Sequence, residues 1–280
     1  MISLLTLLVA STPSAQASDF SWFQLVPGFE KGGAAAQMLH LDESHGASAF
    51  LIPTVWGIVV FILGLAFVAR MGIQGALAKG GTAAYVPDSG LTVRNAFEIV
   101  IEWLYDLVQG LVGKHEAKAF FPLIGTLFFY VLISNLAGFV PGLLPPTESF
   151  SHNLALSLCV FVVFNYAGLS RQGFGYIKHL AGPIALLAPA FLVLETISLL
   201  IRPVSLTVRL SVNIFVDHLL QGIARSLGDT FLGMLGAAVL PVPIYFLGLL
   251  VCVVQAFVFA LLTTIYVSLS VAHTDEHHAH

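Results

Sequence analysis

The stretch LETISLLIRPVSLTVRLSVNIFVDH, residues 194–218, places charged side chains inside an otherwise apolar sequence. Glu195, Arg202 and Arg209 recur in it every seven positions. Seven residues of an α-helix turn through about 700°, so each step returns to within about 20° of the same face. We therefore predict an apolar helix with one stripe of charge.

The composition of the whole chain is that of a membrane protein. Of its 280 residues, 58% are hydrophobic and 9% are charged, and the mean hydropathy is +0.93. Such a sequence is too apolar for a surface that faces water. The formal net charge of -4 and the lack of a basic cluster argue against nucleic-acid binding as the main role. Cys159 and Cys252 both lie in apolar runs, which favours packing over a disulfide or a metal site.

Three segments have the length and apolar character of single membrane spans. They cover residues 50–69, 120–141 and 153–169. Residues 91–113 alternate charged and apolar side chains, which predicts a helix along the membrane surface or against another helix. The connection at residues 142–152 contains the tandem Pro145-Pro146, which cannot continue a helix.

Two later segments are too long for simple spans. Residues 183–224 contain four charged side chains, those of Glu195, Arg202, Arg209 and Asp217. Residues 231–272 contain no Asp, Glu, Lys or Arg. Either each segment breaks, with Pro203 and Pro241/Pro243 as natural kinks, or it crosses the bilayer at a strong tilt. Basic residues follow the first span (Arg70, Lys79, Arg94) and the third (Arg171, Lys178), which predicts that both loops are cytoplasmic.

The two ends of the chain have their own signals. Residues 1–17 combine an apolar stretch with Ala15-Gln16-Ala17, typical of a cleaved signal peptide, although a retained segment is an equal alternative. Residues 18–48 are polar and predict an extramembrane segment outside the cell, before a single helical transmembrane domain at 49–272. The histidine-rich tail, 273–280, predicts an exposed, disordered end rather than a metal site.

The intramembrane charges need partners, water or a function, because an arginine at the bilayer centre costs about 2.5–3.5 kcal/mol on insertion scales. One interpretation is a structural ion pair such as Glu195–Arg202. The other is an ion path in which the permanent charge of Arg209 acts as an electrostatic gate. His218 points about 180° away from Arg209 and ~13 Å further along the axis. With Asp217 it could exchange protons, although a hydrogen-bonded core histidine is the simpler alternative.

Polar amides elsewhere in apolar sequence predict hydrogen bonds between helices. They are Gln255, Asn135, Asn153 and Asn165.

The residues around Arg209 resemble subunit a of the F-type ATP synthase membrane sector. The resemblance lies first in Pro203-Val-Ser-Leu-Thr-Val-Arg209-Leu-Ser-Val-Asn213-Ile-Phe-Val-Asp217-His218, preceded by Leu194-Glu195 and Arg202. The ending Gln255-Ala-Phe-Val-Phe-Ala-Leu-Leu-Thr-Thr-Ile-Tyr266 resembles the family's last helix. Ser134-Asn135-Leu-Ala-Gly138, Pro145-Pro146-Thr147 and Asn153-Leu-Ala-Leu resemble its middle. Together these motifs cover roughly residues 90–272 in the family's order.

The resemblance implies an all-α membrane protein with about five crossings, two long tilted C-terminal helices, an outside N-terminus and a cytoplasmic C-terminus. Its implied partners are a ring of c subunits, the peripheral-stalk b subunits, the remaining subunits of the membrane and catalytic sectors, and the lipid bilayer. Two half-channels would carry protons to and from a carboxylate on each c subunit, with Arg209 between them, and so couple ion flow to rotation. No cofactor or metal is implied.

By position in the family, Asn213, His218 and Gln255 would line the proton path, and Glu195 and Arg202 would lie on its exit side. The family often places an ionisable pair on the last two helices. Here the first position is His218, but the second is Gly248. The entry path would then use His218 with water, or a substitute such as Asp217, Glu148 or His152.

A proton-coupled secondary transporter and a purely structural membrane subunit are the alternative functions. No pair of inverted halves is visible, which counts against the transporter. The sequence has no GxxxxGK[ST] motif, so ATP chemistry is expected in partner subunits. The signal-like start favours a bacterial plasma (inner) membrane as the location.

Overall fold

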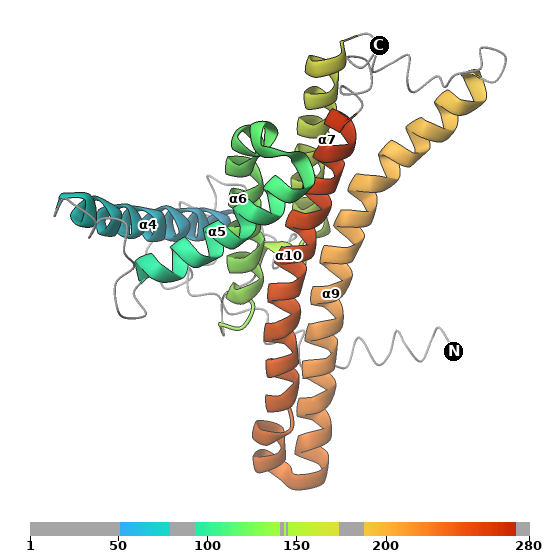
Figure 1. Cartoon of the computed structure of the whole chain (residues 1–280). Helices are drawn as coiled ribbons and strands as arrows, with labels where there is room; N and C mark the ends of the chain where they lie inside the picture. The colour runs from blue at the N-terminus through green and yellow to red at the C-terminus, as the bar shows by residue number, and fades with distance from the viewer. Residues whose placement is uncertain (1–50, 79–92, 141–142, 144, 174–187, 273–280) are drawn as a thin grey trace, which may run out of the picture. The chain divides into compact units, whose positions relative to one another are not determined.

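The computed structural model describes residues 51–78, 93–140, 143, 145–173 and 188–272, in which every regular element is helical (Figure 1). Five of the helices are long and apolar enough to cross a membrane, which confirms the predicted all-α membrane fold. The elements are α4 (Leu51–Ala78), α5 (Val93–Val112), α6 (Lys114–Ala137), η4 (Pro146–Glu148), α7 (Phe150–Gln172), α9 (Ala188–Val239) and α10 (Val242–Ala272).

Several predictions from the sequence fall outside the described residues. They are the signal-like segment 1–17, the extramembrane segment 18–48 and the tail 273–280. The single domain over residues 49–272 stays a prediction.

The first three predicted spans and the amphipathic helix are confirmed as helices, with different ends. α4 continues past Arg70 to Ala78, and α6 begins at Lys114, ahead of the predicted start at 120. α7 begins at Phe150, so the predicted connection is shorter and contains the single turn η4. Pro146 stands at the start of η4, where a proline needs no donor for a helical hydrogen bond.

The two long segments behave differently at their prolines. Pro203 lies inside α9 without ending it, so the break considered there is wrong. The chain leaves helical geometry instead at Gly233, where φ is 62° and ψ is −151°, a conformation that favours glycine. A second break separates α9 from α10 at Leu240 and Pro241, which is the break considered at Pro241/Pro243 as one of the two alternatives.

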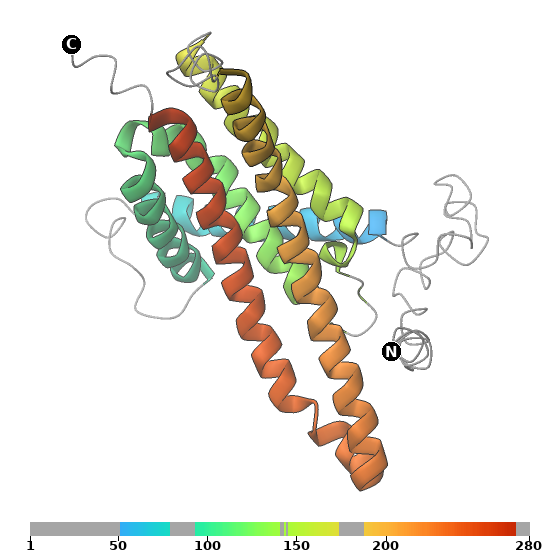
Figure 2. The same cartoon turned by 90° about the vertical axis from the view of Figure 1, so that its right-hand side faces the viewer.

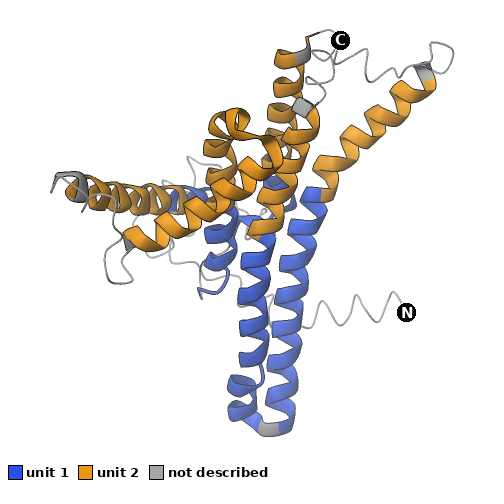
Figure 3. Cartoon of the chain, in the orientation of Figure 1, with its two compact units in different colours: residues 1–57, 131–155, 206–255 blue, residues 58–130, 156–205, 256–280 orange. Residues whose placement is uncertain are grey.

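The chain divides into two compact units (Figure 3). The described part of unit 1 comprises residues 51–57, the stretch 131–155 and the stretch 206–255. Its centre is formed by α9 and α10, which lie side by side in antiparallel directions (Figures 1 and 2). Apolar side chains such as Leu206 and Leu210 are buried there, and so are polar ones such as Asn135 and Asn153. A core that buries amides must hydrogen-bond them.

The described part of unit 2 comprises residues 58–78, 93–130, 156–173, 188–205 and 256–272. Its core is mainly apolar: Leu104, Val108, Ile124, Phe128, Val160, Phe164 and Phe259 are all buried. The charged residues predicted to interrupt α5 lie in its first turn or on its exposed surface. Arg94 donates to Glu98 at 2.7 Å, and Glu102 and Asp106 are exposed. At the other side of the unit, Arg171 donates to Glu116.

Gly113 joins α5 to α6 in unit 2. Its N–H donates to the carbonyl of Gln109 at 3.0 Å, and its own carbonyl accepts from Ala117 at 2.9 Å. The residue therefore closes one helix and opens the next, with φ at 89°. Glycine is the residue that adopts this conformation without strain.

We expect Gly113→Ala to destabilise the protein by about 1–2 kcal/mol, because an added Cβ is strained at positive φ. The Cβ itself would meet no atom within 4 Å, so crowding does not contribute. In a thermal melt of the detergent-solubilised complex, the first transition should fall by roughly 2–4 °C. Gly110→Ala is the matched control, since Gly110 is helical and also has open space around it. Equal melting temperatures for the two variants would contradict the prediction.

Candidate functional site

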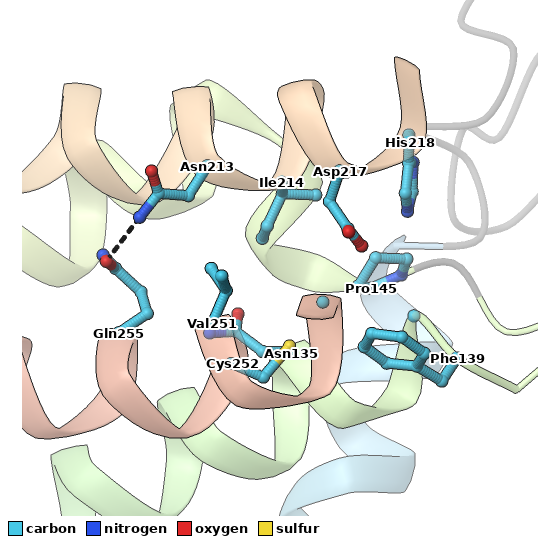
Figure 4. A pocket seen from close by; sticks show the side chains of 12 residues that line it. Asn135, Phe139, Pro145, Asn213, Ile214, Asp217, His218, Val251, Cys252 and Gln255 are labelled. Carbon is cyan, nitrogen blue, oxygen red and sulfur yellow. Dashed lines mark hydrogen bonds between the residues drawn. The ribbon is translucent and has the colours of Figure 1, made fainter. Parts of the chain in front are cut away.

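Polar contacts between α9 and α10 define the candidate site in unit 1. Asn213 donates from Nδ2 to Gln255 Oε1 at 2.7 Å, the link drawn in Figure 4. Further along the pair, Arg225 of α9 donates to the hydroxyl of Tyr245 on α10. The hydrogen bond between helices that the sequence predicts for Gln255 is thus present.

A small cavity, partly open to its surroundings, lies between these helices and the segment around Pro145. Its polar lining comes from α6, α9 and α10 (Figure 4): Asn135, Asn213, Asp217, His218, Cys252 and Gln255. The remaining lining is Gly138, Phe139, Pro145, Ile214, Gly248 and Val251. Most side chains predicted for the path near Arg209 therefore meet in one place.

Asp217 occupies the space that a side chain at position 248 would need. A Cβ built on Gly248 would lie 2.5 Å from Asp217 Oδ1 and 2.9 Å from the ring of Phe139. The other carboxylate oxygen, Oδ2, accepts a hydrogen bond from Gln221 at 2.9 Å. An alanine at position 248 would therefore have to displace this carboxylate and the Phe139 ring.

His218 lies beside a second carboxylate from a different element. Its Nδ1 is 3.6 Å from Glu148 Oε1 of η4, within ion-pair distance but too long for a good hydrogen bond. Of the three substitutes predicted from the sequence, the structure thus brings Asp217 and Glu148 to His218. His152 is half-buried at the start of α7 and does not line the cavity.

Arg209 is exposed and does not line the cavity. Val212, one turn further along α9, and Val216, two turns further along, are exposed as well. Within the described part of the chain, its guanidinium has no hydrogen bond, ion pair or ring contact. His218 thus lines the cavity and Arg209 does not, while the angle predicted between them stays a prediction.

Arg202 is held by aromatic rings in unit 2. Its guanidinium carbon lies 5.7 Å from the ring centroid of Phe164 and 5.4 Å from that of Tyr266. Glu195 is exposed, and the ion pairs among the described residues do not include Glu195–Arg202. The Glu195–Arg202 ion pair of the structural interpretation is therefore wrong. Cation–π contacts with the two rings hold Arg202 in place of a carboxylate.

The amides of the middle segment tie it to α9 in unit 1. Asn153 Nδ2 donates to the carbonyl of Thr147 at 2.7 Å and to Ser211 Oγ at 2.8 Å. Asn165, in unit 2, instead donates to the carbonyl of Phe161 in its own helix at 2.8 Å. The predicted interhelical role is confirmed for Asn153.

Gln221, Arg225, Tyr245 and Phe139 were not singled out by the sequence analysis. Arg225 could have been found, because it follows His218 by seven residues and so lies on nearly the same face of the helix. Tyr245 and Phe139 carry no signal of that kind, since aromatic residues are common in this chain. Neither a metal cluster nor a disulfide is formed by the described residues.

Comparison with known proteins identifies the family. The pattern of the family described as ATP synthase A chain matches residues 49–268. A subunit a of ATP synthase from Bdellovibrio bacteriovorus is 34% identical over 260 residues, which cover 91% of this chain and 99% of that one. The corresponding subunit from Sorangium cellulosum is 41% identical over 192 residues, covering 69% and 72%.

A third relative, ATP synthase subunit a 3 of Pelobacter propionicus, is 37% identical over 237 residues, covering 84% of this chain and 93% of its own. The matched region contains both the cavity and Arg209. The chain belongs to the ATP synthase A chain family, as the motifs around Arg209 predict.

Proposed function

We propose that this chain conducts protons along a path against a ring of c subunits and so couples ion flow to rotation. The observation that carries the proposal is the pair of surfaces on α9. One is a polar cavity that holds Asp217 and His218, and the other is an apolar face on which Arg209 is exposed. A path that delivers protons to a moving partner needs a polar cavity to conduct them and an apolar face for the partner. The two surfaces must be close together but separate.

The entry side of the path consists of Glu148, His218 and Asp217. Carboxylates and imidazole bind and release protons, and these three groups lie on adjacent residues or within 3.6 Å. From Asp217, one helical turn leads to Asn213, and the next leads to Arg209. The Asn213–Gln255 hydrogen bond fixes the two amides that border this last part of the cavity.

Buried polar atoms near the cavity support a hydrated path. Ser134 Oγ, Asn135 Oδ1, Thr147 Oγ1 and Asn153 Oδ1 are buried and have no hydrogen-bond partner among the described residues. All four belong to unit 1, and Asn135 lines the cavity. Buried polar groups without a protein partner are ordinarily satisfied by water. Water here would link the side chains that are too far apart to exchange protons directly.

Arg209 acts as the gate of the proposed path. Arginine stays protonated at physiological pH, so it does not relay protons but attracts a carboxylate and repels a passing cation. A partner carboxyl group is neutral when protonated and can face lipid, whereas its ionised form is stabilised beside Arg209. The exposed apolar side chains around Arg209, including Val208 and Phe215, give such a partner a surface to move along.

The exit side is assigned to Glu195 and Arg202. Glu195 is exposed, which suits a group that releases protons to water. Arg202 is positioned by Phe164 and Tyr266, and so its charge is fixed without neutralisation by a carboxylate. We further propose that b subunits and the catalytic sector complete the assembly, and that the N-terminus faces outside and the C-terminus the cytoplasm. The plasma (inner) membrane of a bacterium is its proposed location.

Arg209→Ala should abolish ATP-driven proton uptake in inverted membrane vesicles while the c-ring remains assembled. The reason is that no fixed charge would then hold the ionised carboxyl group at the gate. Uptake is followed by quenching of a pH-sensitive dye, and assembly by co-purification of the c subunit.

Val216→Ala is the matched control, because it shortens an exposed side chain on nearly the same face of α9 and leaves the charge in place. It should retain most of the uptake. Normal uptake by an assembled Arg209→Ala complex would favour a structural role for the charged stripe. Transport by the isolated chain would favour the secondary transporter.

Gly248→Ala should strongly reduce proton uptake, because its Cβ would collide with Asp217 and with the Phe139 ring. His218→Ala should abolish it by removing a proton-binding group. Both are compared in the same vesicle assay at equal amounts of assembled complex.

Gly110→Ala again provides the control, since its Cβ would meet open space on α5. Uptake at the wild-type rate in Gly248→Ala would mean that the position of the Asp217 carboxylate does not matter. Uptake at that rate in His218→Ala would remove His218 from the path.

A further inference from the structure

Arg225 is a third arginine on α9, with a partner of its own. It lies seven residues beyond His218, on nearly the same face and ~10.5 Å further along the axis. The apolar span that contains both ends six residues later, at Phe231. The proposed topology puts this end of α9 at the outer side of the membrane, so Arg225 stands between His218 and that side.

Tyr245 of α10 holds Arg225 in two ways. The guanidinium donates a hydrogen bond to the Tyr245 hydroxyl, and its carbon lies 5.8 Å from the centroid of the same ring. The Tyr245 ring in turn packs edge-on against Phe139, with centroids 6.1 Å apart. Phe139 is part of the cavity wall. The position of the charge is therefore fixed relative to the cavity.

The charge of Arg225 remains available to act on the proton-binding groups. Tyr245 is a neutral partner, so it orients the guanidinium without cancelling its charge. Among the described titratable and charged groups, Glu148 from η4 lies 3.6 Å from His218, and Asp217 from α9 and Cys252 from α10 line the same cavity. Arg225 follows two turns further along α9, with Tyr245 from α10 as its partner. Among these described groups, Arg225 is the one permanent cation.

We propose that Arg225, clamped by Tyr245, is a positioning residue that sets the pH at which the His218 and Asp217 site loads a proton. This inference rests on the proposed function. A fixed cation disfavours protonated His218 and favours ionised Asp217, so both effects lower the proton affinity of the site. The His218 and Asp217 site, which would open to the outer side of the membrane, would then release its proton readily toward Arg209 instead of holding it.

Removing the charge should move proton loading to higher pH. At ~10.5 Å, one unit charge changes a proton affinity by about 0.3 pH units in water and by about 1 pH unit near a protein surface. Arg225→Gln should therefore shift the midpoint of the pH profile upward within that range. Arg225→Lys keeps the charge and should leave the midpoint near the wild-type value.

The experiment uses the whole complex in liposomes, driven by a constant potassium diffusion potential. The rate of ATP synthesis is measured while the pH is varied on the side of the membrane that corresponds to the outside of the cell. Tyr245→Leu frees the arginine and should shift the midpoint in the same direction as Arg225→Gln, by less. Because this variant leaves Arg225 in place, it tests the proposal even where Arg225→Gln does not assemble.

The outcomes separate this inference from the proposed function. Upward shifts in Arg225→Gln and Tyr245→Leu, with an unshifted Arg225→Lys, would support it. Superimposable profiles for Arg225→Gln and wild type, with no synthesis in His218→Ala, would overturn this inference alone. An equal loss of rate in Arg225→Gln and Arg225→Lys without a shift would also overturn it, as a purely structural role. Synthesis at the wild-type rate in His218→Ala would overturn the proposed function as well.

Discussion

The cost of a permanent positive charge inside an apolar helix is the constraint from which the rest of this structure can be understood. Arginine cannot escape that cost by losing its proton, so each one needs a neighbour that stabilises its charge. On α9 the chain meets the requirement at Arg202 and Arg225 with aromatic rings. At Arg209 the described part of the chain supplies no such neighbour, and the side chain is exposed.

The choice of aromatic partners has a consequence for function. A carboxylate would neutralise each arginine and leave a dipole, whereas a ring holds the guanidinium in place and keeps its net charge. In unit 1, the charge of Arg225 is thereby kept within reach of the cavity. Acidic groups are then free to serve elsewhere. Asp217 turns one oxygen to Gln221 and the other toward Gly248, and it forms no ion pair with an arginine among the described residues.

Much of this arrangement follows from the sequence, because helix periodicity and the cost of buried charge are local properties. The heptad spacing of Glu195, Arg202 and Arg209 predicts one charged face of a helix, and the offset of nine positions from Arg209 to His218 predicts opposite faces. Helix ends were less predictable. α4 passes Arg70 because one terminal charge can remain exposed, and α9 passes Pro203 because a proline costs one hydrogen bond that a long helix can lose.

What the sequence could not provide are contacts between segments that lie far apart in the chain. In the sequence, Gly248 stands where the family often has an ionisable residue. Only the contact between a Cβ built on Gly248 and Asp217 Oδ1 shows that the Asp217 carboxylate fills the space of that side chain. The pairing of Arg225 with Tyr245 is of the same kind, because it depends on the register that the turn at Gly233 and the break at Pro241 impose. A shift of α10 by one residue would rotate its side chains by about 100° and separate both pairs. The register of this helical hairpin is therefore what turns scattered polar residues into one site.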